Sequence, residues 1–208
     1  VLSLAADDPE GARRHLHEAM AEWSQNRYLV QHWQAMHYEA EIELYVGDGA
    51  RAYERVVRDE RALKRSFLLR AQVIRTFTTY LRGRCALVSI AAVPARRAQR
   101  LKEAAVCARR LERESAPWAN ALGSIVRASL ESEKGDRDGA IASLREAIDR
   151  ADTARLVLHA AAARRQLGIA LGGDEGDALF KQGEGTLTAQ DVVAPSRMAD
   201  RLVPGHWT

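Results

Sequence analysis

Aromatic residues, cysteines and long apolar runs are all scarce in this sequence. Aromatics make up only 6% of the 208 residues, whereas alanine is abundant. This balance favours close helix–helix packing over a sheet, because strands prefer β-branched and aromatic residues. The two cysteines, Cys85 and Cys107, form no CxxC or Cys/His ligand spacing, which argues against a disulfide framework or a zinc site. No apolar run approaches the ~20 residues that span a bilayer, so we expect a soluble, cytoplasmic protein with no membrane partner.

Catalytic and metal-binding motifs are missing as well. The sequence has no GxGxxG, VAIK, HRD or DFG, so it cannot carry phosphoryl transfer by itself, and it has no GxSxG elbow. His15 and His17 are two residues apart, and His32 and His37 are five apart. Neither spacing matches the i, i+4 step that places two imidazoles on one helix face. We therefore predict no catalytic residue, no cofactor and no metal.

The charges are mixed rather than concentrated. The formal net charge is +3, with 27 arginines and four lysines interspersed with 28 acidic residues. The charge run over residues 51–65 alternates in sign and is typical of a solvated helix face. Arg96, Arg97 and Arg100, at the start of a predicted helix, are a better candidate for an anion-binding patch. A surface of this kind does not favour nucleic acid as a partner.

Apolar residues recur with helical spacing along most of the chain, and no window shows the sustained alternation of a strand. We predict an all-α protein with about nine helices and no sheet. The helices are expected at Pro9–Ser24, at Leu29–Val46, after Asp48, at Ser66–Val93, from about residue 95 to 114, at Trp118–Lys134, after Asp136, at Thr153–Leu171, from Asp174 to Ala189, and at Pro195–Leu202. Within the longest of these, Cys85 falls on the buried row, and Gly83 marks a candidate close contact between helices.

A Gly-Asp pair recurs between predicted helices, at residues 47–48, 135–136 and 173–174, each with an alanine five residues after the glycine. Glycine can close one helix and aspartate can cap the next. Ala140, Leu144 and Ala147 follow the small-large-small pattern of the second helix of a tetratricopeptide repeat, which this segment resembles. Glu131 and Arg127 depart from that pattern, so the repeats are degenerate. The resemblance implies one antiparallel helix-hairpin stack, an α-solenoid over residues 1–208, with 1–93 and 94–208 as sub-units.

Residues 116–208 also resemble the helical C-terminal regions of multidomain bacterial Ser/Thr protein kinases of the myxobacterial type. The resemblance is carried by the runs RQLG at 165–168, LGGDEG at 171–176, PSRMA at 195–199 and LVPG at 202–205. It implies a kinase domain earlier in the parent polypeptide. The first residue is Val1 rather than Met, so we expect the chain to be a fragment of that longer protein.

These observations predict a non-catalytic scaffold that docks substrates, regulators or the kinase domain, with a protein or peptide as partner, including a segment of its own polypeptide. Two alternatives stay open: the helical sensor arm of a nucleotide-binding signalling ATPase or transcription regulator, and an enzyme or small-ligand binder housed in the helical core. In tetratricopeptide stacks the first helices line the concave groove. The resemblance therefore implies these groove positions: Gln34, His37, Glu41, Tyr45, Leu122, Ile125, Ser129 and Glu133.

Overall fold

The computed structural model describes residues 2–23 and 27–207, and within these ranges the protein has no strand. The described residues form eleven α-helices and two short 3₁₀ helices. Their bounds are α1 Leu2–Ala5, α2 Pro9–Ala21, α3 Val30–Tyr45, α4 Gly49–Arg65, η1 Leu68–Arg70, α5 Gln72–Val88, η2 Pro94–Arg96, α6 Arg97–Glu112, α7 Pro117–Lys134, α8 Arg137–Thr153, α9 Val157–Leu171, α10 Gly173–Ala189 and α11 Pro195–Leu202. The all-α prediction is confirmed, with more helices than the nine expected. The predicted helix end at Ser24 lies outside the described residues.

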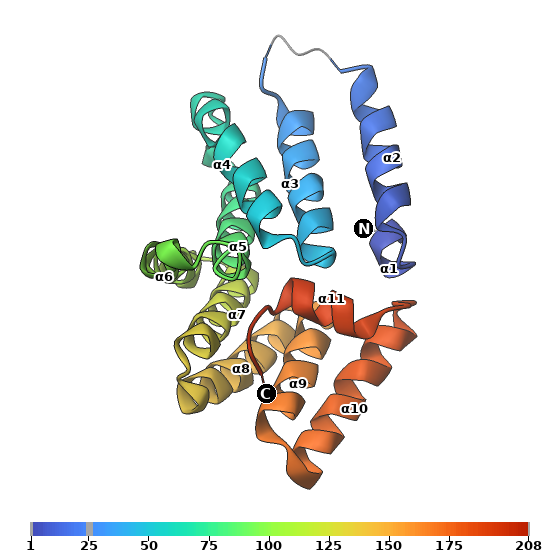
Figure 1. The fold of residues 1–208 in the computed structure, drawn as a ribbon, viewed down its shortest axis with the longest axis vertical. Helices are drawn as coiled ribbons and strands as arrows, with labels where there is room; N and C mark the ends of the chain where they lie inside the picture. Colours follow the sequence, from blue (N-terminus) through green and yellow to red (C-terminus); the bar gives the residue numbers. More distant parts are fainter. Residues whose placement is uncertain (1, 24–26, 208) are drawn as a thin grey trace.

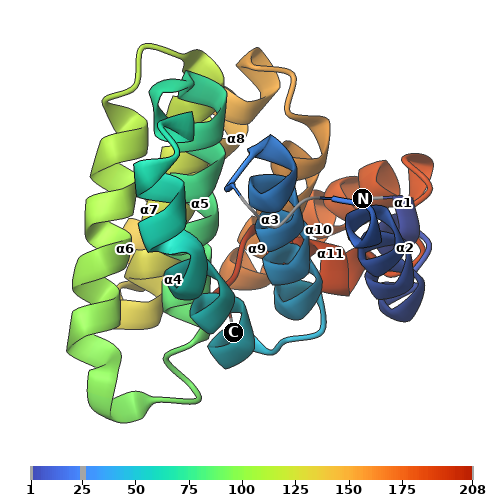
Figure 2. The same cartoon turned by 90° about the horizontal axis from the view of Figure 1, so that it is seen from above.

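Consecutive helices pack against one another as antiparallel neighbours, and the chain then folds back on itself (Figures 1 and 2). The last helix, α11, packs on α9 and also on α3, which precedes it by about 150 residues. A backbone hydrogen bond of 2.8 Å from the Val193 amide to the Ala5 carbonyl joins the segment before α11 to α1. The extended solenoid that the resemblance implies is not confirmed.

Two of the three predicted Gly-Asp turns have the expected geometry. Gly47 and Gly135 are left-handed, with φ of +81° and +78°. Asp48 and Asp136 each accept a hydrogen bond of 3.0 Å from a backbone amide of the following helix. The third turn differs, because the consecutive glycines at 172 and 173 both have positive φ, of +65° and +63°, and the helix already begins at residue 173. Asp174 therefore lies in the first turn of α10 and does not cap it.

The predicted long helix Ser66–Val93 is broken at its start and shortened at its end. Phe67 adopts a left-handed conformation with φ of +63°, so a 3₁₀ turn precedes α5, which runs only from residue 72 to 88. The predicted close contact at Gly83 is confirmed: a Cβ atom there would lie 2.9 Å from Val126 Cγ1 and 3.2 Å from Cys107 Cβ. Cys85 is buried as predicted, and both cysteines are free thiols.

Helix α5 connects the two large parts of the apolar core. Tyr80 and Leu87 belong to the cluster built mainly from α6 to α11, whereas Leu81 and Cys85 belong to the cluster between α3, α4 and α5. Side chains on two faces of one helix are therefore buried. Hydrogen bonds from Tyr80 and Arg84 to backbone carbonyl oxygens of α11 also join α5 to the last helix.

Candidate binding site

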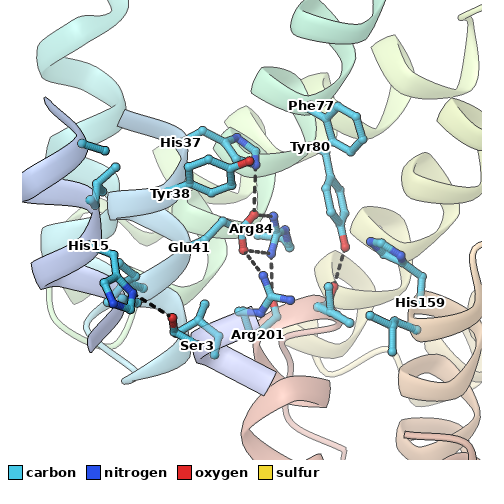
Figure 3. A pocket seen from close by; sticks show the side chains of 17 residues that line it. Ser3, His15, His37, Tyr38, Glu41, Phe77, Tyr80, Arg84, His159 and Arg201 are labelled. Carbon is cyan, nitrogen blue, oxygen red and sulfur yellow. Dashed lines mark hydrogen bonds and ion pairs between the residues drawn. The ribbon is translucent and has the colours of Figure 1, made fainter. Parts of the chain in front are cut away.

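A cavity of about 440 Å³ lies where the first, middle and last helices meet (Figure 3). It is lined from α1, α2, α3, α5, α9 and α11. Most of its wall is apolar. The apolar lining residues are Leu4, Ala12, Leu16, Ala19, Ile42, Phe77, Leu158 and Leu202. Because the wall comes from both ends of the chain, the cavity exists only when α11 packs back onto α3.

A buried ionic cluster forms one side of this cavity. The carboxylate of Glu41 lies between two guanidinium groups, those of Arg84 on α5 and Arg201 on α11 (Figure 3). Glu41 Oε2 lies 2.6 Å from Arg201 Nη1 and 3.2 Å from Arg84 Nη1, and Oε1 accepts from Arg84 Nη2. Arg84 Nη1 also donates to the Arg201 carbonyl oxygen over 2.8 Å. The cluster therefore joins three helices through side chains that are at most 8% exposed.

The charge states in the cluster follow from burial and from the neighbouring groups. Burial alone would raise the pKa of Glu41, but the two guanidinium groups outweigh it and hold this pKa well below its usual value. Burial, together with the nearby arginines and against the opposing effect of Glu41, lowers the pKa of His37 to about 4 and that of His159 to about 3. Both imidazoles are then neutral near pH 7. Two guanidinium groups share one carboxylate, which leaves one positive charge in excess.

Several polar atoms at the cavity have no hydrogen-bond partner among the described residues. They are Arg84 Nε, Arg201 Nε and His37 Nδ1, and all three are buried. Arg201 Nη2 contacts only the sulfur of Met198, 3.0 Å away, and sulfur is a weak acceptor. Unsatisfied buried polar atoms are uncommon in proteins. This side of the cavity therefore has unused capacity to donate hydrogen bonds.

Tyr80 and His159 complete the polar part of the wall. The Tyr80 hydroxyl donates to the Leu202 carbonyl oxygen over 2.6 Å, which ties α5 to α11. The centroids of the His159 and Tyr80 rings are 5.8 Å apart. The guanidinium carbon of Arg84 lies over the Tyr80 ring, 4.0 Å from its centroid. These rings fix the position of Arg84 beside the cavity.

The groove positions of the first predicted repeat divide between this cavity and its surroundings. His37 and Glu41 both line the cavity. Tyr45, one turn further along α3, is buried and donates to Asp7 Oδ1 over 2.8 Å instead of lining the cavity. Gln34 is exposed and is not among the cavity residues.

The groove positions of the later repeat do not form an open surface. Leu122, Ile125 and Ser129 are each 0% exposed, because α7 is covered by its neighbours on that face. Glu133 contacts the chain's own tail: its Oε1 lies 3.2 Å from His206 Nε2. In this structure the three buried residues therefore present no surface to a partner.

The three arginines proposed as an anion patch are also separated. Arg100 is 5% exposed and lies over the ring of Tyr53, with 3.4 Å between its guanidinium carbon and the ring centroid. Arg97 donates to the Glu133 carbonyl oxygen. Both guanidinium groups are engaged within the protein, so the sequence cluster does not become one open patch.

Sequence reasoning missed Arg84, Arg201, Tyr80 and His159, which are four of the nine polar residues that line the cavity. One signal was available for Arg84, since it interrupts the broad apolar face of its helix between Gly83 and Cys85. A charged residue on a buried face requires a partner. Nothing in the sequence indicated that the partner would be Glu41.

The described residues contain no group of three or more His, Cys, Asp or Glu side chains placed to hold a metal ion. Over the same ranges, no helix has the length and apolar character needed to cross a membrane. No family model, curated protein or solved structure matches this chain.

Proposed function

We propose that this chain is a non-catalytic binding module that captures a peptide segment of a partner protein, or of its own parent polypeptide, in the central cavity. The observation that carries the proposal is the cavity itself, which combines a mostly apolar wall with a buried ionic cluster. Ligand sites in proteins are commonly concave and mostly apolar, with a few polar groups that fix orientation. Its volume of about 440 Å³ suits one or two side chains rather than a folded domain.

The charge states of the polar groups favour binding over catalysis. A general acid or base works best with a pKa near the operating pH. The Glu41 carboxylate is held ionised between two guanidinium groups, and the pKa values of His37 and His159 lie at about 4 and 3. None of these groups is therefore ready to exchange a proton near neutral pH.

The helical hairpins and the C-terminal resemblance support a more specific parent. We infer that the chain is the tetratricopeptide-like interaction region of a multidomain bacterial Ser/Thr protein kinase, where it docks a substrate, a regulator or the kinase domain. The second candidate is the sensor arm of a nucleotide-binding signalling ATPase or transcription regulator, which the ligand-sized cavity favours. The parent gene decides between them: a kinase domain supports the first, and a nucleotide-binding domain without a kinase supports the second.

The binding proposal is tested by selecting peptides from a random phage-displayed library on the purified chain. Ala12 lines the cavity from α2, so Ala12→Phe should fill part of its volume. Ala189→Phe, at an exposed position on α10 outside the cavity, is the matched control. We expect selected peptides to bind Ala12→Phe at least about tenfold more weakly than Ala189→Phe, since one lost anchor is worth roughly 1–3 kcal/mol. Equal binding to both variants would refute the cavity as the site.

A further inference from the structure

The ionic cluster beside the cavity has fewer negative than positive charges. Arg84 and Arg201 have only Glu41 within 4.0 Å among the carboxylates of the described residues. The nearby Asp7 is engaged by Tyr45 and Arg197. A buried charge is costly unless it is paired. A second anion at this point would restore the balance.

The free hydrogen-bond donors lie on the same groups. The Nε atoms of Arg84 and Arg201 are buried without a partner, and Arg201 Nη2 meets only a sulfur atom. Guanidinium groups present planar, paired donors that match the two oxygens of a carboxylate. Arg84 and Arg201 both line the cavity, so their guanidinium groups lie beside a ligand that is placed in it.

The apolar residues that line the cavity set a second requirement for the ligand. Leu16, Ile42, Phe77 and Leu158 present aliphatic and aromatic surface to the same space. A strongly hydrated polyanion such as inorganic phosphate would leave this surface uncovered, and a cation would be repelled by the excess positive charge. The ligand group must combine a single negative charge with an apolar body.

We propose that the cavity binds a carboxylate carried on an apolar body, with the carboxylate at Arg201 and the body against the α2–α3 wall. This inference rests on the proposed function, because it names the chemistry of the group that enters the same cavity. A peptide that ends in a leucine with a free carboxyl terminus has this chemistry, and so does a medium-chain fatty acid.

Two matched probe pairs test the charge requirement by isothermal titration calorimetry on the whole chain. The first pair is an N-acetylated Gly/Ser pentapeptide ending in leucine, with either a free carboxylate or a carboxamide terminus. The second pair is octanoate and octanol. We expect each carboxylate to bind at least tenfold more tightly than its neutral partner. The tighter of the two carboxylates identifies the source as a peptide terminus or a free acid.

Arg201→Gln should remove the preference for the carboxylate while leaving the neutral probes unchanged, since Gln keeps a donor for Glu41. Arg145→Gln, which removes an exposed arginine paired with Glu175, is the control and should keep the preference. If Arg201→Gln fails to fold, Ala12→Phe serves instead and should weaken all four probes together.

Equal affinity for carboxylate and neutral probes, or no binding of any of the four, would overturn the carboxylate inference. If the library yields peptides whose binding is weakened by Ala12→Phe but does not depend on a carboxylate, the proposed binding function is still supported. Failure of the library selection would remove the function as well, so the two outcomes are distinguishable.

Discussion

Replacement of Glu41 by glutamine should be one of the most destabilising single substitutions in this protein. The change leaves Arg84 and Arg201 buried, at 1% and 7% side-chain exposure, with no carboxylate between them. Removing one partner of a buried ion pair typically costs about 3–5 kcal/mol, because the remaining charge stays uncompensated. Here two charges lose their partner, so we expect the upper part of that range. A chain of this size loses about 2–4 °C in Tm for each kcal/mol, so a loss of about 4–5 kcal/mol lowers Tm by roughly 8–20 °C.

Urea unfolding followed by circular dichroism measures the loss directly, as a lower midpoint at unchanged slope. The control is Glu175→Gln, which removes an exposed ion pair of 3.1 Å with Arg145 and should cost at most about 1 kcal/mol. A loss for Glu41→Gln no greater than that of the control would refute the reasoning. It would mean that the two guanidinium groups are stabilised by water or another anion rather than by this carboxylate.

Three further outcomes follow from the packing and the charge states. The pKa values of His37 and His159 in the folded protein are lowered by burial to about 4 and about 3. Between about pH 6.5 and pH 4, the two imidazoles therefore become protonated in the unfolded chain but not in the folded one. The free energy of unfolding should therefore fall by roughly 3 kcal/mol between pH 7.5 and 5.5, and the double variant with both residues changed to Gln should show a flatter pH profile. Gly168→Ala should destabilise the protein by about 1–3 kcal/mol in thermal unfolding, because the new Cβ atom would lie 2.5 Å from a backbone oxygen of α10. The control Gly185→Ala places its Cβ atom where nothing lies within 4 Å, so it should stabilise the protein by about 0.5–1 kcal/mol. Tyr80→Phe removes the buried donor of a 2.6 Å hydrogen bond to α11 and should cost about 1–3 kcal/mol in the same assay, and an unchanged Tm would contradict that role.

The helices could be predicted where their signals are local. Capping at Asp48 and Asp136 depends on a few consecutive residues, and both caps are present. The break at Phe67 was missed because apolar periodicity continues across it, although the backbone there is left-handed. Periodicity reports which face is buried, and it does not report whether the helix is continuous. The third turn was mispredicted for a local reason, since two successive glycines both adopt positive φ there and the helix begins one residue before Asp174.

The candidate site could be predicted only in the part that one helix supplies. The row of His37 and Glu41 follows from i, i+4 spacing on α3, and both residues line the cavity. Arg84 meets Glu41 because α5 packs on α3, whereas Arg201, 117 residues further along the chain, meets it only because α11 folds back onto α3. Helical periodicity carries no information about that return. The repeat resemblance gave the opposite expectation, an extended stack with an open groove.

The return of α11 connects the stability of the fold to occupancy of the cavity. Glu41 holds α11 in place through Arg201, and the same guanidinium group is the donor that we assign to an incoming carboxylate. A ligand that pairs with Arg201 without displacing Glu41 adds a second attachment between α11 and the wall of α2 and α3. Binding to the folded state alone then stabilises it by about 2.7 kcal/mol at a ligand concentration one hundred times Kd. A ligand that displaced Glu41 from Arg201 would instead loosen α11, so faster amide hydrogen exchange in α11 on ligand addition would distinguish this arrangement from the first.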